Sequence, residues 1–191
     1  SSAPAPLPGD CLKHHDTTSH LTAMTVPSVR AYDPTYAYEV STIIRHGIRE
    51  MYEEDQDVVY YITVMNDKYL MPEKPKEADD AIIRGLHRVR EAKKPAIHLA
   101  GSGAILPEVL EAADRLENDF KVKADVWSAT SWKALYDNAI RVDRENRLHP
   151  DDKPSAPFIQ EQFSDGAPVV AATDYVRAVP LSVAAWVPGG L

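Results

Sequence analysis

The chain has 191 residues, of which 44% are hydrophobic and 26% charged, a composition typical of a folded protein of one or two domains. Its formal net charge of -8, without any cluster of lysine and arginine, argues against nucleic acid as a partner. A single cysteine, Cys11, excludes an intrachain disulfide. We find neither a membrane-spanning apolar run nor a signal peptide, so we expect no membrane contact and a cytoplasmic location.

The first part of the chain predicts a leader, a loop and a helix. Residues 1–9 contain three prolines and two serines, which predict a flexible leader, and residues 10–32 show no helical or strand period, which predicts a loop. Asp33 and Pro34 are typical of a helix start. The helix is predicted to continue to about Glu54, because apolar residues recur at three- and four-residue spacing. These residues are Val40, Ile43, Ile44, Ile48 and Met51.

Residues 57–65 are mainly β-branched and aromatic, which predicts a strand buried on both faces in a parallel sheet. The charged, proline-containing stretch that follows predicts a linker. Beyond it, predicted strands alternate with predicted helices, the second helix capped by Thr130 or Ser131. This alternation predicts an α/β fold with mostly parallel sheets covered by helices. The expected strands are 96–100, 123–129 and 168–172, and the expected helices are 107–120 and 132–147.

Two sequence features could carry chemistry. The turn Gly101-Ser102-Gly103, between a strand and a helix, could hold a phosphate, although most such turns are purely structural and this one lacks a full dinucleotide or P-loop pattern. His14, His15 and His20, with Asp16 among them, form the densest group of proton-transferring or metal-binding residues. Their spacing matches no helical zinc pattern, so a solvated polar loop is the competing interpretation.

Other polar and aromatic residues are interpreted as structural. Four further histidines are expected at the surface or in satisfied core positions, and the tyrosines around the first helix and strand fit either a subunit interface or a core. The histidines are His46, His87, His98 and His149, and the tyrosines are Tyr32, Tyr36, Tyr38, Tyr52, Tyr60 and Tyr61.

Several segments, read in order, resemble the homodimeric type of pyruvate dehydrogenase decarboxylating component, a transketolase-like family. They include Tyr-Asp-Pro-Thr-Tyr-Ala-Tyr-Glu-Val at 32–40, Val-Tyr-Tyr-Ile-Thr-Val-Met-Asn at 59–66 and Tyr-Leu-Met-Pro at 69–72. The resemblance continues with Leu-Ala-Gly-Ser-Gly-Ala-Ile-Leu at 99–106, Ala-Asp-Val-Trp-Ser at 124–128, Arg-Glu-Asn-Arg-Leu-His-Pro at 144–150 and Ala-Thr-Asp-Tyr at 172–175. It covers the chain from about Gly9 to its last residue.

The resemblance implies a domain organisation. Residues 10–71 would be the C-terminal part of a pyrimidine-binding domain, 72–77 a linker, and 78–191 a truncated transketolase C-terminal-like domain. It also implies thiamine diphosphate and magnesium as cofactors of the complete enzyme. The family's Gly-Asp-Gly motif with its downstream Asn, and its cofactor-activating glutamate, are not in this chain, so we assign it no cofactor-binding or metal-binding residue. The implied partners are a second copy or a complementary chain, the lipoyl-bearing acetyltransferase core of the complex, and pyruvate.

One departure from the family concerns the histidine loop. The family pattern is Gly-Leu-Gln-His-Glu-Asp-Gly-His-Ser-His, whereas this chain has Thr17 in place of the second glycine and Thr18 in place of the following histidine. Threonine cannot donate a proton near neutral pH as histidine can. The resemblance implies that the histidine after the Asp-Gly is the active-site histidine, and the flanking His14 and His20 remain here. Either His20 or His15 substitutes for it, or the copy is catalytically impaired.

Three functions remain open. The first is part of a pyruvate dehydrogenase decarboxylating subunit, in which this chain alone is expected to be inactive. The second is a split or degenerate paralogue that acts as a non-catalytic assembly partner. The third is a transketolase-like enzyme acting on another 2-oxo acid or a sugar phosphate.

Overall fold

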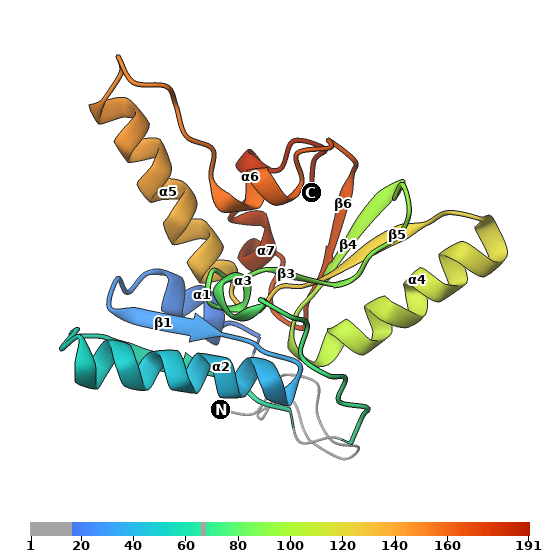
Figure 1. The fold of residues 1–191 in the computed structure, drawn as a ribbon, viewed down its shortest axis with the longest axis horizontal. Coiled ribbons are helices and arrows are strands. Elements are labelled where there is room, and N and C mark those ends of the chain that lie inside the picture. The colour runs from blue at the N-terminus through green and yellow to red at the C-terminus, as the bar shows by residue number, and fades with distance from the viewer. Residues whose placement is uncertain (1–16, 66–67) are drawn as a thin grey trace.

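The computed structural model describes residues 17–65 and 68–191, and these form two sheets covered by helices (Figure 1). In the smaller sheet β1 (Val29–Tyr32) pairs in parallel with β2 (Val59–Ile62). The larger sheet has the strand order β3-β5-β4-β6, in which β4, β5 and β6 are parallel and β3 is an antiparallel edge strand. The bounds of these strands are β3 (His87–Arg90), β4 (Ile97–Gly101), β5 (Ala124–Ser128) and β6 (Val169–Ala172). The predicted α/β class, with mostly parallel sheets, is confirmed.

The larger sheet lies between two layers of helices. On one face, α4 (Leu106–Phe120), which follows the 3-10 turn η3 (Gly103–Ile105), buries Leu106 and Val109 against the sheet. The other face is covered by α5, α6 and α7, whose buried side chains include Leu135, Phe158 and Val179. These elements and the last 3-10 turn are α5 (Trp132–Leu148), α6 (Phe158–Gln162), α7 (Ala178–Leu181) and η4 (Ala184–Trp186).

The strands and long helices predicted for this half agree with the structure to within one or two residues at most ends. Of the two residues expected as cap of the second helix, Ser131 is the cap, since its Oγ accepts a hydrogen bond from the Ala134 amide at 2.9 Å. The short helices α3 (Asp79–Ile83), α6 and α7 were not predicted, because four or five residues are too few to show a helical period. Strand β3 was not predicted because its sequence, His-Arg-Val-Arg, lacks the apolar run of β4, β5 and β6.

The first half departs from its prediction along the expected loop and at the start of the first helix. The expected loop contains α1 (Ser19–Met24) and β1. The helix predicted from Asp33 and Pro34 begins later, as α2 (Ala37–Ile48), and continues as the π-helix η2 (Arg49–Glu53). Its first turn is closed by Glu39, whose Oε2 accepts hydrogen bonds from the amides of Thr35 and Tyr36 at 2.6 and 2.9 Å. Asp33 is therefore not the cap of α2 but lies directly after β1.

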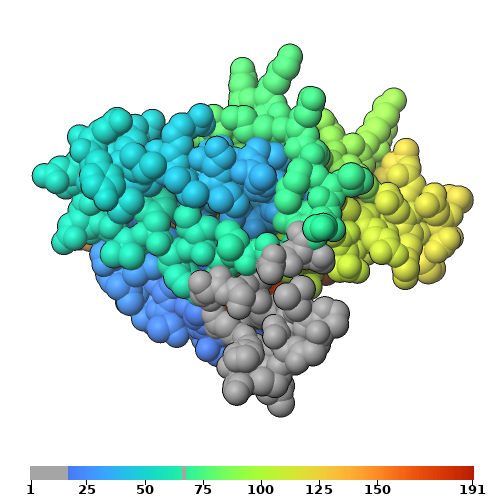
Figure 2. Space-filling view, turned by 90° about the horizontal axis from the view of Figure 1, so that it is seen from below, coloured from blue at the N-terminus to red at the C-terminus, as the bar shows by residue number. Residues whose placement is uncertain are grey.

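The apolar stripe of α2 is only partly buried. Ile43 is fully buried, but Ile44 and Ile48 are 47% and 51% exposed, along a groove of about 1020 Å³ that also borders Asp79. Val59 on β2 is 60% exposed, so the prediction of a strand buried on both faces is wrong. Figure 2 shows α2 on the outer surface of this side of the molecule. The nearby tyrosines fall into two groups, because Tyr32 and Tyr36 are core residues whereas Tyr52 is 80% exposed.

The two sheets meet at the carboxyl ends of their parallel strands. The Asp33 amide, after β1, donates to the Thr130 carbonyl at 2.8 Å, and the Gly103 amide, after β4, donates to the Asp33 carbonyl at 3.0 Å. The Ser131 hydroxyl donates to the Ala31 carbonyl at 2.6 Å. The chain segments that leave these strands are therefore held together by direct hydrogen bonds. Among the helices described, none is long and apolar enough to span a bilayer.

Candidate active site

Polar residues follow the carboxyl ends of four parallel strands and converge at the junction of the two sheets. Asp33 follows β1, Thr63 follows β2, Ser102 follows β4, and Thr173 and Asp174 follow β6. The Ser102 hydroxyl donates to Thr173 Oγ1 at 3.0 Å, and Asp33 lies against both Thr63 and Ser102. Because open α/β sheets bind ligands beyond the carboxyl ends of their strands, this junction is the candidate site.

His20 is the predicted site residue that the structure brings to this junction. The helix α1 places its Nε2 atom 3.1 Å from Thr63 Oγ1, and the Thr63 hydroxyl donates in turn to Asp33 Oδ1 at 2.6 Å. All three residues are buried, with exposed fractions of 4% for His20, 0% for Thr63 and 4% for Asp33. A histidine, a hydroxyl and a carboxyl thus form one continuous chain of hydrogen bonds.

Burial changes the acidity of this carboxyl. It raises the pKa of Asp33 from 3.8 to about 6, because the ionised form loses its hydration. Hydrogen bonds with Thr63 and Ser102 favour the ionised form and limit the rise, whereas the negative charges of Asp174 and Glu39 add to it. Asp33 therefore changes its charge near neutral pH, as a group that takes part in proton transfer must.

Two tyrosine rings fix the position of the His20 imidazole. The Tyr175 ring centroid lies 4.4 Å from that of His20, and the Tyr61 centroid lies 5.4 Å away. The Tyr61 hydroxyl donates to Ser19 Oγ at 2.9 Å, which ties β2 to the start of α1. The imidazole is therefore held between the two halves of the chain rather than in solvent.

The Gly101-Ser102-Gly103 turn is filled by protein. Gly103 has a φ of +49°, and a Cβ atom there would lie 2.6 Å from both carboxylate oxygens of Asp33. The Thr35 hydroxyl donates to the Gly103 carbonyl at 2.7 Å, which closes the turn further. The Asp33 carboxyl thus fills the space beside Gly103, and the Gly103 amide is already bonded to the Asp33 carbonyl, which favours the structural interpretation of the turn.

The remaining histidine-loop residues are only partly described. His14 and His15 lie outside the described residues. Thr18, at the position of the family histidine, is exposed, and the Thr17 carbonyl accepts a hydrogen bond from the Val176 amide at 2.9 Å. Of the three histidines in this segment, His20 is thus the one that the structure describes, and it lies at the strand ends.

The other four histidines lie away from the chain of His20, Thr63 and Asp33. His149 is exposed, and His46 is half-buried with its Nδ1 atom 2.8 Å from the Tyr60 hydroxyl. His87 Nε2 lies 2.6 Å from Glu39 Oε1, which also accepts a hydrogen bond from the Ser128 hydroxyl at 2.6 Å. Glu39 is fully buried and joins α2 to strands β3 and β5.

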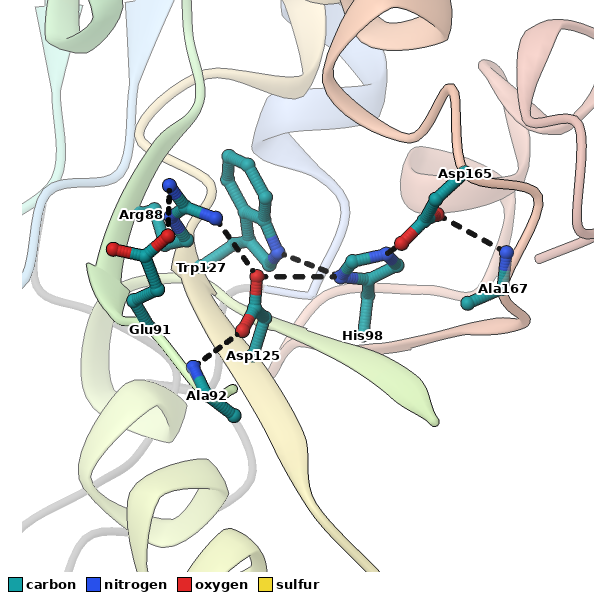
Figure 3. A network of polar contacts seen from close by, with 8 residues as sticks. All are labelled: Arg88, Glu91, Ala92, His98, Asp125, Trp127, Asp165 and Ala167. Carbon is teal, nitrogen blue, oxygen red and sulfur yellow. Dashed lines mark hydrogen bonds and ion pairs between the residues drawn. The ribbon is translucent and has the colours of Figure 1, made fainter. Parts of the chain in front are cut away.

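His98 belongs to a second polar network at the opposite, amino end of the larger sheet (Figure 3). Its Nδ1 atom accepts a hydrogen bond from Trp127 Nε1 at 3.2 Å, so Nε2 carries the proton and donates to Asp165 at 3.0 Å. Asp125 lies on the other side, where it forms an ion pair with Arg88 at 3.0 Å. This network ties strands together and shares no residue with the candidate site.

Sequence reasoning missed Asp33, Thr63 and Glu39. Asp33 was assigned to a helix cap, whereas its place directly after a parallel strand was the signal of a site residue. Thr63 was counted within a strand, although it lies just past the end of β2. Glu39 gave no signal, because its partners are distant in sequence.

The described residues contain no group of three or more His, Cys, Asp or Glu side chains that could hold a metal ion. In the candidate site the charges of Asp174 and Glu39 act on the Asp33 carboxyl, and burial keeps Asp33 partly protonated near neutral pH. A magnesium ion prefers several ionised or carbonyl oxygens around it. The side chains described at this junction therefore do not fit magnesium.

Comparison with known proteins identifies both halves of the chain. Residues 2–72 match the pyruvate dehydrogenase E1 component middle domain, and residues 85–187 match the transketolase-like C-terminal domain. The chain is 49% identical over 186 residues to the pyruvate dehydrogenase E1 component of Pseudomonas aeruginosa, covering 95% of this chain and 21% of that protein. It is 41% identical over 185 residues to the Escherichia coli protein of the same name, again covering 95% and 21%. The chain thus spans about a fifth of these relatives.

Solved structures show the same fold at low sequence identity. The transketolase from Leishmania mexicana superimposes with a TM-score of 0.58 at 13% identity, covering 85% of this chain and 21% of that one. A Pichia stipitis transketolase variant gives a TM-score of 0.55 at 14% identity, covering 91% and 25%. The two domain matches and the identity to the bacterial proteins place the chain in the pyruvate dehydrogenase E1 component family, and its second half in the transketolase-like C-terminal domain family.

Proposed function

We propose that this chain forms part of a pyruvate dehydrogenase E1 component, which decarboxylates pyruvate and transfers the acetyl group to lipoyl groups of the complex. The supporting observation is the 49% identity to the Pseudomonas aeruginosa protein over almost the whole chain. In the complete enzyme, thiamine diphosphate with magnesium would supply the carbanion chemistry. Because the described residues do not fit magnesium, the cofactor would be held by other segments or by a partner chain.

In this proposal His20 is the residue of this chain that carries protons for the reaction. It lies buried at the carboxyl ends of the strands, in contact with Thr63, where a histidine can donate and accept protons near neutral pH. His14 and His15 precede it in the sequence and are proposed to contact the substrate. The exposed apolar face of α2, with Ile44 and Ile48, supports association with a second copy or a complementary chain.

The experiment replaces the matching segment of the Pseudomonas aeruginosa E1 component with this chain. If the proposal holds, the chimaera supports pyruvate-dependent NADH formation with the other subunits of that complex, thiamine diphosphate and magnesium. His20→Gln in the chimaera should lower kcat by about 100-fold, the size of a lost acid-base group. His149→Gln is the matched control, because His149 is exposed and follows the end of α5, where its Nε2 atom lies 3.7 Å from Glu145 Oε2. A fully folded chimaera without activity would contradict the proposal.

A second candidate is a non-catalytic assembly partner. The observation that favours it is Thr18, which replaces the histidine of the family loop and is exposed in the structure. On this reading, the Thr18→His variant of the chimaera would be active whereas the unchanged chimaera would not. An active chimaera whose product from pyruvate is not an acetyl group would instead indicate a different transketolase-like reaction.

A further inference from the structure

From the contacts of His20, we infer that Asp33 is a positioning residue that sets the tautomer of this imidazole through the Thr63 hydroxyl and replaces the proton that the imidazole donates. This inference rests on the proposed role of His20 in the reaction. It assigns a task to two residues that come from different strands and that no sequence motif connects.

The geometry allows one pathway for the proton. Thr63 Oγ1 lies 3.1 Å from His20 Nε2, 2.6 Å from Asp33 Oδ1 and 3.3 Å from the Tyr32 carbonyl oxygen. Thr63 is fully buried, and His20 and Asp33 are each only 4% exposed. Bulk water therefore does not reach this hydroxyl, and the proton on Oγ1 must be shared among these neighbours.

When Asp33 is ionised, the direction of each hydrogen bond is fixed. A threonine hydroxyl has one proton, and both Asp33 Oδ1 and the Tyr32 carbonyl can only accept it. The shorter, charge-assisted contact to Asp33 is the stronger one, so Thr63 donates to Asp33. Thr63 Oγ1 can then only accept from His20, which places the imidazole proton on Nε2 and the lone pair on Nδ1. In this state His20 is set to act as a base.

When Asp33 is protonated, the chain of hydrogen bonds reverses. The Asp33 carboxyl donates to Thr63, and the Thr63 hydroxyl donates to Nε2 of His20, whose own proton is then on Nδ1. As Nδ1–H breaks and its proton passes to the substrate, Nε2–H forms with the Thr63 proton, and Thr63 Oγ1–H re-forms with the proton of Asp33. The imidazole stays neutral, Asp33 becomes a carboxylate, and one proton has moved from Asp33 to the substrate.

The surroundings of Asp33 keep both states accessible. Its carboxyl faces Thr63 after β2, Ser102 after β4, Asp174 after β6 and Glu39 on α2. Burial is the largest cause that raises its pKa to about 6, so the protonated and ionised forms exchange near neutral pH. A relay of this kind works best when the pKa of its donor lies close to the working pH.

The first test uses the pH profile of kcat/KM in the chimaeric E1 component. Thr63→Val keeps the shape of the side chain but removes the hydroxyl. We expect kcat/KM to fall by about 100-fold, and the limb of its pH profile near pH 6 to disappear. Thr63→Ser keeps the hydroxyl and should retain both the value of kcat/KM and the limb near pH 6. Asp165→Asn is the matched control, because Asp165 also accepts a hydrogen bond from a buried histidine, at the other end of the sheet. An unchanged profile in Thr63→Val would overturn the inference.

The second test does not depend on activity. In the 191-residue chain labelled with 15N-histidine, the His20 signals should show the Nε2–H tautomer at neutral pH and shift toward Nδ1–H as the pH falls through the Asp33 pKa of about 6. Asp33→Asn should abolish this pH dependence, and Thr63→Val should remove the tautomer preference while Thr63→Ser keeps it. If the chimaera is inactive but this pattern is found, the proposed function fails and the positioning role of Asp33 stands. If His20 has the same tautomer mixture in Thr63→Val as in the unchanged chain, the inference fails whatever the activity.

Discussion

His87 Nε2 lies 2.6 Å from Glu39 Oε1, and this contact crosses from strand β3 of the larger sheet to helix α2 of the first half. Glu39 is fully buried and also accepts hydrogen bonds from the Ser128 hydroxyl and from the amides of Thr35 and Tyr36. Among the described residues, His87 Nδ1 has no hydrogen-bond partner, so Glu39 is what holds this ring. One carboxylate thus organises the junction beside the candidate site.

Glu39→Ala should therefore lower the free energy of unfolding strongly. The substitution leaves a buried histidine, a hydroxyl and two amides without their acceptor, a loss of at least about 3 kcal/mol. Urea unfolding at neutral pH measures it. Asp114→Ala is the matched control, since Asp114 is 59% exposed in its ion pair with Arg90 and should cost less than about 1 kcal/mol. Equal losses in the two variants would show that Glu39 does not organise the junction.

Stability should also depend on pH through Asp33. Its folded pKa of about 6 lies above the unfolded value of 3.8, so between these values the folded state binds more protons than the unfolded state. The contribution of Asp33 to stability is then fully present below about pH 4 and is lost as the pH rises through 6, by roughly 3 kcal/mol. Asp33→Asn removes this term, so its stability relative to the unchanged chain should rise with pH between 4 and 7. A constant difference across that range would contradict the raised pKa.

Gly103→Ala tests the contact between the glycine turn and Asp33. Both a positive φ and a Cβ atom 2.6 Å from the carboxylate oppose alanine, so we expect a loss of more than about 2 kcal/mol. Gly166→Ala is the control, because Gly166 has a φ of +73° but no atom within 4 Å of the added Cβ, and it should cost about 1 kcal/mol. The difference in melting temperature between the two variants isolates the steric term.

The opposite end of the sheet gives a pH effect of the other sign. The hydrogen bond with His98 lowers the pKa of Asp165, so this contribution is present above the unfolded value near 3.8 and is lost as the pH falls through the folded value. Asp165→Asn should reduce stability slightly at neutral pH, and the difference should vanish in acid once the Asp165 carboxyl is protonated in both states. Thermal unfolding of both chains in acid and at neutral pH measures this, and a difference that persists in acid would exclude the pair as its cause.

The sequence predicted the second half of the chain better than the first for a physical reason. Helices α4 and α5 bury a regular apolar stripe against the larger sheet, so their periodicity is a direct record of their packing. In α2 the same periodicity includes Ile44 and Ile48, which are about half exposed. The apolar period therefore predicted more burial for this helix than the structure has. The residues of the site were harder to predict from the sequence, because the hydrogen bond between Thr63 and Asp33 depends on how two strand ends come together.

The placement of the tryptophans gives this molecule two separate optical reporters. All three tryptophans, Trp127, Trp132 and Trp186, lie beyond residue 78, and the first two are core residues of the larger sheet. The smaller sheet and α2 contain tyrosines instead, among them the stacked rings of Tyr32 and Tyr60. Tryptophan emission will thus follow the larger sheet, while tyrosine absorbance will mainly follow the smaller one. Transitions that coincide by both signals would mean that the junction around Glu39 makes the two halves melt as a single cooperative unit.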